Sequence, residues 1–236
     1  MSKSVLGPVL CAAALSVHAA GLASSPQDQA AKVDAIFQEY AKDSSPGCAV
    51  GVYQDDKIVL ARAYGMANLD HDVKLTPASV FHVASVSKQF TAAAILLLAQ
   101  EGKLTLDDEV RKHIPELPDF GPKLTIRHLV HHTSGLRDQW DLLTFAGWRY
   151  SRDLITDQDV LSLLARQTDL NFPPGDRHLY SNSGYTLLAV IVSRASGRTF
   201  RQFTTERIFA PLGMTKTHSA GPLDNSRPSG SLRRWG

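Results

Sequence analysis

Cysteine is scarce in this chain, which has two such residues, Cys11 and Cys48, among 236. Cys11 lies in an N-terminal stretch that we expect to be removed on export, which leaves Cys48 without a partner. No disulfide can then form within the mature chain. We therefore expect a fold held together by its core alone, with Cys48 as a buried apolar residue just before a strand.

An excess of charge of one sign is also lacking. The chain has 25 Lys and Arg against 23 Asp and Glu, which gives a net charge of +2. This balance gives no reason to expect nucleic acid or an anionic membrane as a partner. Two local signatures are missing as well, namely a Gly-rich phosphate loop and the G-x-S-x-G elbow of α/β-hydrolases. The sequence therefore indicates neither of those classes, and it calls for no cofactor.

The first residues have the pattern of an export signal. Lys3 supplies a positive charge, residues 5–22 are mostly apolar, and small-residue cleavage sites end at Ala19 or Ala23. We expect residues 1–23 to be a cleaved signal peptide and the mature protein to be periplasmic or extracellular, without stable membrane insertion. The alternative is a transmembrane anchor, but Pro8 and His18 interrupt an apolar run that barely reaches a spanning length.

Beyond that segment, hydrophobic periodicity and capping residues predict mostly helices with one early pair of strands. One helix, over residues 85–99, is apolar on every face, as in a buried central helix. The expected elements are a helix that starts at Pro26, a hairpin of residues 49–54 and 57–64 joined by Asp55-Asp56, the apolar helix, short helices capped at Thr105, Thr125 and Thr156, an apolar helix over residues 183–195 that ends at Gly197, and a helix that starts at Thr199.

A serine and a lysine lie three residues apart where the central apolar helix begins. Positions i and i+3 share one helix face, so Lys88 can lie beside the hydroxyl of Ser85. A serine hydroxyl needs a neighbouring base to become a good nucleophile, and a first helical turn offers N–H groups that stabilise negative charge. The pair is typical of a serine acyl-enzyme, although serine is also a common N-cap. A buried lysine without a role would be costly.

The second candidate motif is Tyr180-Ser181-Asn182, about a hundred residues later. Tyr180 could act as a base or proton relay, or it could be an ordinary half-buried loop tyrosine. Asn182 could orient Lys88 and donate to a substrate carbonyl, or it could be a turn or cap residue. A neutral Lys88 acting as base and a charged Lys88 that lowers the pKa of Tyr180 both remain open.

These residues carry a family resemblance. The segment F-H-V-A-S-V-S-K-Q-F-T, residues 81–91, resembles the nucleophile motif of the serine β-lactamase and penicillin-binding-protein superfamily. The class C branch, with its esterase and D-aminopeptidase relatives, is most similar because its members use Y-x-N where class A enzymes use S-D-N. The stretches His132-Thr133-Ser134-Gly135 and Pro211-Leu212-Gly213-Met214 are also similar to that family, and the resemblance runs from about residue 33 to residue 218.

The resemblance implies an α/β (α+β) fold of the β-lactamase/transpeptidase type, with an antiparallel sheet region, a helical region and the site in the cleft between them. Ser85 would attack an amide, β-lactam or ester carbonyl of a small-molecule or peptide substrate, and its own N–H would form half of the oxyanion hole. Lys88 and Tyr180 would move protons, and Asn182 would position the substrate. The acyl-enzyme would then be hydrolysed.

The same resemblance predicts that part of the fold is missing. The family completes its sheet with C-terminal strands and a final helix, and carries a K-T-G or H-x-G motif there that this sequence does not show. We expect residues 24–218 to be a partial β-lactamase-like domain and residues 219–236 an irregular tail. A non-catalytic penicillin-binding-like sensor and an inactive truncated fragment are the alternatives to an enzyme.

Three histidines are the best candidates for a metal site. His128, His131 and His132 have the spacing i, i+3 and i+4 of one helix face. A zincin would need glutamate directly after the first histidine, and Leu129 stands there. The sequence therefore favours a helix C-terminus, where histidine suits the helix dipole and Gly135 closes the turn, and it predicts no metal.

Overall fold

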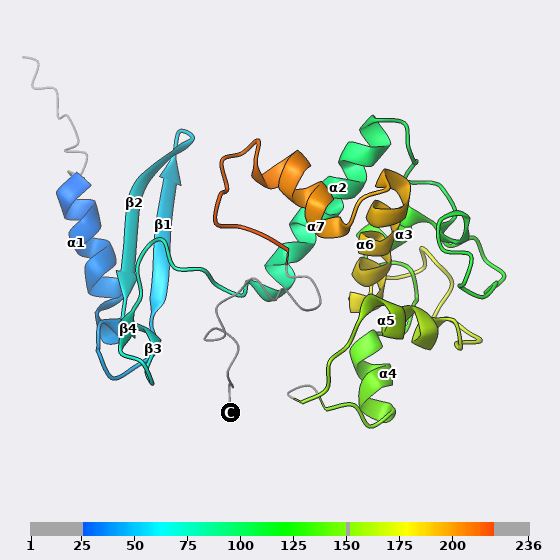
Figure 1. The fold of residues 1–236 in the computed structure, drawn as a ribbon, viewed down its shortest axis with the longest axis horizontal. Helices are drawn as coiled ribbons and strands as arrows, with labels where there is room; N and C mark the ends of the chain where they lie inside the picture. Colours follow the sequence, from blue (N-terminus) through cyan, green and yellow to red (C-terminus); the bar gives the residue numbers. More distant parts are fainter. Residues whose placement is uncertain (1–25, 150–151, 220–236) are drawn as a thin grey trace, which may run out of the picture. The chain divides into compact units, whose positions relative to one another are not determined.

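The computed structural model describes residues 26–149 and 152–219, so the expected signal peptide and nearly all of the expected tail lie outside the described residues. The chain divides into two compact units, Met1–Ser79 and Val80–Gly236 (Figure 1). Within the described part of the chain, no helix combines the length and the apolar character needed to cross a membrane.

The first unit consists of a helix and two small antiparallel sheets. Its elements are α1 (Pro26–Ile36), the 3₁₀ helix η1 (Gln38–Tyr40), β1 (Cys48–Gln54), β2 (Lys57–Tyr64), β3 (Met66–Asn68) and β4 (Val73–Lys74). β1 pairs with β2 and β3 pairs with β4. The expected helix and hairpin are therefore confirmed. Cys48 lies in β1 rather than before it, and it is only partly buried because the described sheet has two strands.

The hairpin turn follows from its two aspartates. Asp55 and Asp56 both have positive φ, 49° and 59°, as a type I′ turn requires. This turn matches the right-handed twist of the strands. At the other end of the hairpin, the Phe37 ring stacks on the Tyr64 ring at 5.4 Å, and the Tyr64 hydroxyl donates to Asp34 at 2.7 Å. These contacts fasten the end of α1 to β2.

The second unit is helical. Its elements are η2 (Ala84–Ser87), α2 (Lys88–Gln100), η3 (Val110–Lys112), α3 (Ile126–Val130), α4 (Gln139–Phe145), α5 (Asp157–Leu164), α6 (Asn182–Ser196), α7 (Phe200–Thr204) and the π-helical turn η4 (Thr205–Phe209). The helix α6 packs against α2, α3, α4, α5 and α7 (Figure 1). Its fully buried side chains include Leu187, Leu188 and Ile191, which place α6 at the centre of the core.

The capping residues set the bounds of these helices. Thr125, Thr156 and Thr199 each form a capping box, as expected from threonine at the N-cap. Gly197 ends α6 with φ of 69° in the left-handed region. The short α-helix predicted after Thr105 is wrong. The Thr105 N–H donates to Asp108 at 3.1 Å, but the turn that they form leads to a 3₁₀ helix.

The central apolar helix differs from its prediction in two respects. The α-helix begins at Lys88, and Ser85 stands in a 3₁₀ turn before it, because the N–H groups of Val86 and Lys88 bond to carbonyls three residues back instead of four. The helix is also buried on one face only. Ala94, Ile95 and Leu98 are fully buried, whereas Leu96 is 53% exposed.

Candidate active site

Ser85 and Lys88 lie side by side at the junction of η2 and α2. The Lys88 ammonium group donates to Ser85 Oγ at 3.1 Å. The residue before the serine, Ala84, has a φ of 44°, a conformation that costs a residue with a Cβ about 1–2 kcal/mol. The backbone directly before Ser85 is therefore strained.

Tyr180 and Asn182 come from the beginning of α6. Ser181 is the N-cap of this helix, and its side chain accepts from the Gly184 N–H. The hydroxyls of Ser85 and Tyr180 lie 2.6 Å apart, and the Lys88 ammonium donates to Asn182 Oδ1 at 2.9 Å. All four residues predicted from the sequence are thus brought together. Their chemical roles stay a prediction.

The packing of α2 against α6 produces this convergence. Ser85 and Tyr180 are 95 residues apart in the chain, and each stands next to the first turn of one of these two packed helices. The buried faces of both helices belong to one hydrophobic core, which includes Ile95 and Leu98 of α2 and Leu187 and Ile191 of α6. The geometry of the site is therefore set by core packing within the unit Val80–Gly236.

Lys88 determines the electrostatics of the cluster. Its Nζ lies 4.7 Å from the centre of the Tyr180 ring, in a cation–π geometry. Burial acts to raise the pKa of Tyr180, but the polar interactions with Lys88 and Ser85 and the positive charge of Lys88 outweigh it and lower this pKa. Tyr180 is 44% exposed, so a phenol with a lowered pKa faces solvent beside Ser85.

Asp138 belongs to this network and was missed by the sequence analysis. It is the N-cap of α4, and its Oδ1 accepts from the Trp140 N–H at 2.9 Å. Its Oδ2 accepts from both the backbone N–H and the side-chain amide of Asn182. The available signal was an aspartate three residues after Gly135, but nothing in the sequence connects that position with Asn182.

His132 was also missed as a neighbour of Tyr180. It lies beyond the end of α3 with a φ of 57°, and its Nδ1 accepts from the Ser181 N–H at 3.1 Å. His128 instead takes part in the capping box of Thr125. The Thr125 N–H donates to Nδ1 of His128 at 3.2 Å. In the part of the chain that the structure describes, no three His, Cys, Asp or Glu side chains form a potential metal site.

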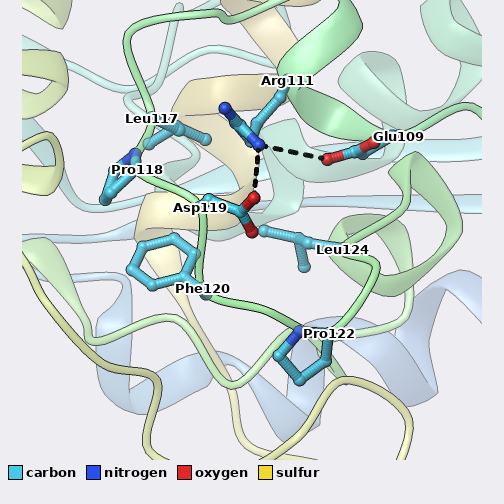
Figure 2. A pocket seen from close by; sticks show the side chains of 8 residues that line it. All are labelled: Glu109, Arg111, Leu117, Pro118, Asp119, Phe120, Pro122 and Leu124. Atoms are coloured by element: carbon cyan, nitrogen blue, oxygen red, sulfur yellow. Dashed lines mark ion pairs between the residues drawn. The ribbon is translucent and has the colours of Figure 1, made fainter.

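The structure also has a small pocket on a different part of this unit (Figure 2). Its lining consists of Glu109, Arg111, Leu117, Pro118, Asp119, Phe120, Pro122 and Leu124. Arg111 pairs with Asp119 at 3.1 Å and with Glu109 at 3.9 Å across this pocket. None of the four predicted site residues lines it. Its ion pairs are exposed, and we assign it no role.

Comparisons with known proteins identify the family. The family model named Beta-lactamase matches residues 33–233. The chain is 34% identical over 192 residues to penicillin-binding protein 4* of Bacillus subtilis, a match that covers 81% of this chain and 42% of the relative. It is 36% identical over 182 residues to the D-aminopeptidase of Brucella anthropi, which covers 77% of this chain and 34% of the relative. The chain therefore spans about two fifths or less of the length of these curated relatives.

A solved structure shows the same fold. The octameric penicillin-binding protein homologue from Pyrococcus abyssi is similar with a TM-score of 0.68 and 28% identity, over 78% of this chain and 43% of that one. The expected β-lactamase/transpeptidase-like fold, with helices and small antiparallel sheets, is confirmed. The match to the family model, which extends over most of the sequence, shows that the chain belongs to the beta-lactamase family.

Proposed function

We propose that this chain is a serine hydrolase that forms an acyl-enzyme on Ser85. The observation that carries this proposal is the 2.6 Å contact between the hydroxyls of Ser85 and Tyr180, with Lys88 3.1 Å from the same serine oxygen. A nucleophile within hydrogen-bond distance of a base, which is in turn oriented by a third group, is the general arrangement for covalent catalysis.

In the first step, Tyr180 takes the proton of Ser85 while Ser85 Oγ bonds to the substrate carbonyl carbon. The lowered pKa of Tyr180 supports this role, because it increases the fraction of phenolate near neutral pH. Lys88 acts as the adjacent positive charge. The proton then passes to the leaving amine or alkoxide as the bond from the carbonyl carbon to that group breaks. Water subsequently releases the acid and regenerates the Ser85 hydroxyl.

Two further groups assist the substrate. The N–H of Ser85 is at the start of η2, where the first N–H groups of a helical turn lack carbonyl partners from that turn, and it donates to the developing oxyanion. Asn182 holds Lys88 through its Oδ1. The substrate classes are amides, β-lactams and esters, and the likeness to a D-aminopeptidase supports including amides. The pattern of residues 1–23 supports the further proposal that the chain is exported.

Covalent labelling tests the proposal. The full chain is treated with a fluorophosphonate, and the adduct is located by mass spectrometry in the native protein, in Ser85→Ala and in the matched control Ser87→Ala. Ser87 stands in the same 3₁₀ turn and is also exposed. We expect an adduct on Ser85 that is lost in the first variant and retained in the second. An adduct elsewhere would refute the assignment.

Turnover separates an enzyme from a non-catalytic sensor. A chromogenic cephalosporin, a nitrophenyl ester and a D-alanine nitroanilide present the three carbonyl types to the same serine. An enzyme releases product over many cycles from at least one of them. A sensor would be labelled once at Ser85 and release no further product, which would contradict the hydrolase proposal while leaving the nucleophile assignment intact.

A further inference from the structure

His132 accepts hydrogen bonds from the residues on both sides of Tyr180. The N–H of Leu179 donates to the His132 carbonyl oxygen at 2.8 Å, and the N–H of Ser181 donates to His132 Nδ1 at 3.1 Å. The residue before Tyr180 and the residue after it are therefore both held by one histidine. We call these two hydrogen bonds, from Leu179 and from Ser181 to His132, the bracket. The backbone of Tyr180 cannot move relative to His132 without breaking one of these hydrogen bonds.

The ring of His132 also contacts the phenol ring that the bracket holds. The centres of the His132 and Tyr180 rings are 4.6 Å apart, with 30° between the ring planes. On the same histidine, the Tyr185 ring lies at 5.0 Å and 32°, and the Tyr185 hydroxyl donates to the Val130 carbonyl at 3.0 Å. Tyr185 is thus anchored to the end of α3, and its contact helps to fix the His132 ring.

The backbone of His132 is unfavourable in isolation. Its φ of 57° lies in the left-handed region, which costs a residue with a Cβ about 1–2 kcal/mol. Such a conformation persists where the surrounding contacts compensate for it, and it is found preferentially at functional sites. At His132 it directs the carbonyl and the ring of one residue toward the same segment, residues 179–181.

We propose that neutral His132 is the positioning residue for Tyr180 and holds its hydroxyl within hydrogen-bond distance of Ser85. This inference rests on the proposed function, in which Tyr180 is the proton acceptor. His132 itself touches neither Ser85 nor the substrate in this mechanism. Its contribution is to keep the phenol in place during proton transfer, where small displacements are costly in rate.

The bracket requires one protonation state of the ring. Nδ1 accepts the Ser181 N–H, so it carries a lone pair and the ring is the neutral Nε2–H tautomer. A proton on Nδ1 would place the ring N–H of His132 against the backbone N–H of Ser181, and two donors repel each other. Protonation at low pH would therefore break the contact with Ser181 and release Tyr180.

The groups around His132 favour the neutral form on balance. Burial, the nearby His178 and the charge of Lys88 lower the pKa of His132, whereas the carboxylate of Asp138 raises it. The hydrogen bond that the Ser181 N–H donates to Nδ1 also favours the neutral ring, because Nδ1 can accept it only without a proton. The other titratable groups facing the ring are Tyr180 and Tyr185. The ring is consequently neutral at pH 7, and the bracket is lost as the pH falls below the ordinary histidine value of 6.5.

Two substitutions separate the acceptor of His132 from its ring. His132→Asn retains an oxygen that can accept from the Ser181 N–H, tolerates a positive φ and does not titrate. His132→Phe retains an aromatic ring but has no acceptor. His131→Asn is the matched control, since the neighbouring His131 is exposed and stands at the end of α3.

The rate of Ser85 labelling by a fluorophosphonate is measured from pH 4.5 to 8. In the native chain and in His131→Asn we expect the rate to fall through an inflection below pH 6.5. In His132→Asn that inflection should disappear, with the rate at pH 7.5 within about threefold of native. His132→Phe should be slower at every pH, by about tenfold or more, as expected from about 1.4 kcal/mol of lost transition-state stabilisation. An unchanged inflection in His132→Asn would overturn the inference.

Nuclear magnetic resonance tests the hydrogen bond from Ser181 to His132 independently of any labelling reaction. Long-range ¹H–¹⁵N spectra of the histidine rings should show His132 as the Nε2–H tautomer with a pKa below 6.5. The Nδ1–H tautomer would refute the bracket. If Ser85 is not labelled in the native chain, the proposed function fails, and the tautomer of His132 alone then tests whether the bracket exists. If His132→Phe does not melt cooperatively, the labelling of His132→Asn and the tautomer of His132 in the native chain test the inference.

Discussion

Asp138 holds Asn182 at two points with one carboxylate oxygen. Its Oδ2 accepts from the Asn182 backbone N–H at 2.5 Å and from the side-chain amide at 3.0 Å. A carboxylate only accepts hydrogen bonds, so the NH₂ end of the amide must face Asp138. The Oδ1 end then faces Lys88, from which it accepts at 2.9 Å. Asp138 thereby fixes the orientation of the group that holds the lysine.

Replacing Asp138 by asparagine should slow the acylation of Ser85 about tenfold, equivalent to about 1.4 kcal/mol, because the amide of Asn182 loses its defined orientation. Asparagine caps helices about as well as aspartate, so α4 should keep its N-cap. Labelling rates and thermal melting measure the two effects separately. Asp138→Ala, which also removes the cap, should cost about 1 kcal/mol more in stability. Native acylation by Asp138→Asn would contradict the role given to Asp138.

Lys88 and Tyr180 should behave as one proton-transfer unit. Lys88→Gln and Tyr180→Phe should each lower the rate of acylation by roughly a hundredfold or more, the usual contribution of a positioned acid–base group. The double variant should be little slower than either single one, since effects within a unit do not add. A double-mutant cycle of labelling rates checks this, and losses that multiply would show that the two groups act independently.

Gly135 should not tolerate a side chain. A Cβ at this position would lie 2.1 Å from the Phe172 carbonyl oxygen, and φ is 71°. Gly197 has nearly the same φ, 69°, and open space around it, so Gly197→Ala shows the cost of the conformation alone. We expect Gly135→Ala to lower the free energy of unfolding by about 1–3 kcal/mol more than Gly197→Ala, because of overpacking against backbone. Denaturant titration measures both. Equal losses would show that the contact relaxes freely.

Glu116 should make stability depend on pH in acid. Arg194 donates to both of its carboxylate oxygens, at 2.7 and 2.9 Å, and these bonds chiefly lower the pKa of Glu116 from 4.5 to about 2. Because the folded pKa is lowered, the stabilisation is present above pH 4.5 and is lost as the pH falls toward 2. The pair is partly exposed, so we expect a contribution below about 1 kcal/mol.

Melting temperatures of the native chain and of Glu116→Gln, compared from pH 7 to pH 2, test this. The difference between the two should shrink as the pH falls, since glutamine does not titrate. A constant difference over the whole range would show that the pKa of Glu116 is the same in the folded and the unfolded state.

The two faces of α2 should respond differently to truncation. Leu98 is fully buried, whereas Leu96 is 53% exposed on the same helix. Leu98→Ala should lower the free energy of unfolding by about 2–5 kcal/mol, because it leaves a cavity in the hydrophobic core. Leu96→Ala should change it by less than about 1 kcal/mol. Chemical denaturation measures both, and equal effects would show that Leu96 is buried in solution.

Local patterns predicted most of the elements because their causes are local. The capping boxes at Thr125 and Thr156 and the left-handed Gly197 depend on residues within one turn, so spacing alone reveals them. The start of α2 was misplaced because the first turn is 3₁₀ helix, which is common at helix ends. Four residues are too few for the hydrophobic spacing to distinguish the two kinds of helix.

The site was predictable only where the chemistry resides in short motifs. Ser85 and Lys88 are three residues apart, and Tyr180 and Asn182 are two apart, so each pair could be recognised. The supporting residues escaped notice because their partners are distant. Asp138 lies 44 residues from Asn182, and His132 was interpreted as a helix-end histidine because its contact with Ser181 spans 49 residues.

The 95-residue separation of Ser85 and Tyr180 has a consequence for the chain as it is made. Synthesis proceeds from the N-terminus at roughly 5–20 residues per second, so Ser85 and Lys88 leave the ribosome about 5–20 s before Tyr180. During that interval Ser85 has no Tyr180 hydroxyl beside it. Under the proposed mechanism, we therefore expect the nascent polypeptide not to react with acylating compounds until α6 has been synthesised and has docked onto α2.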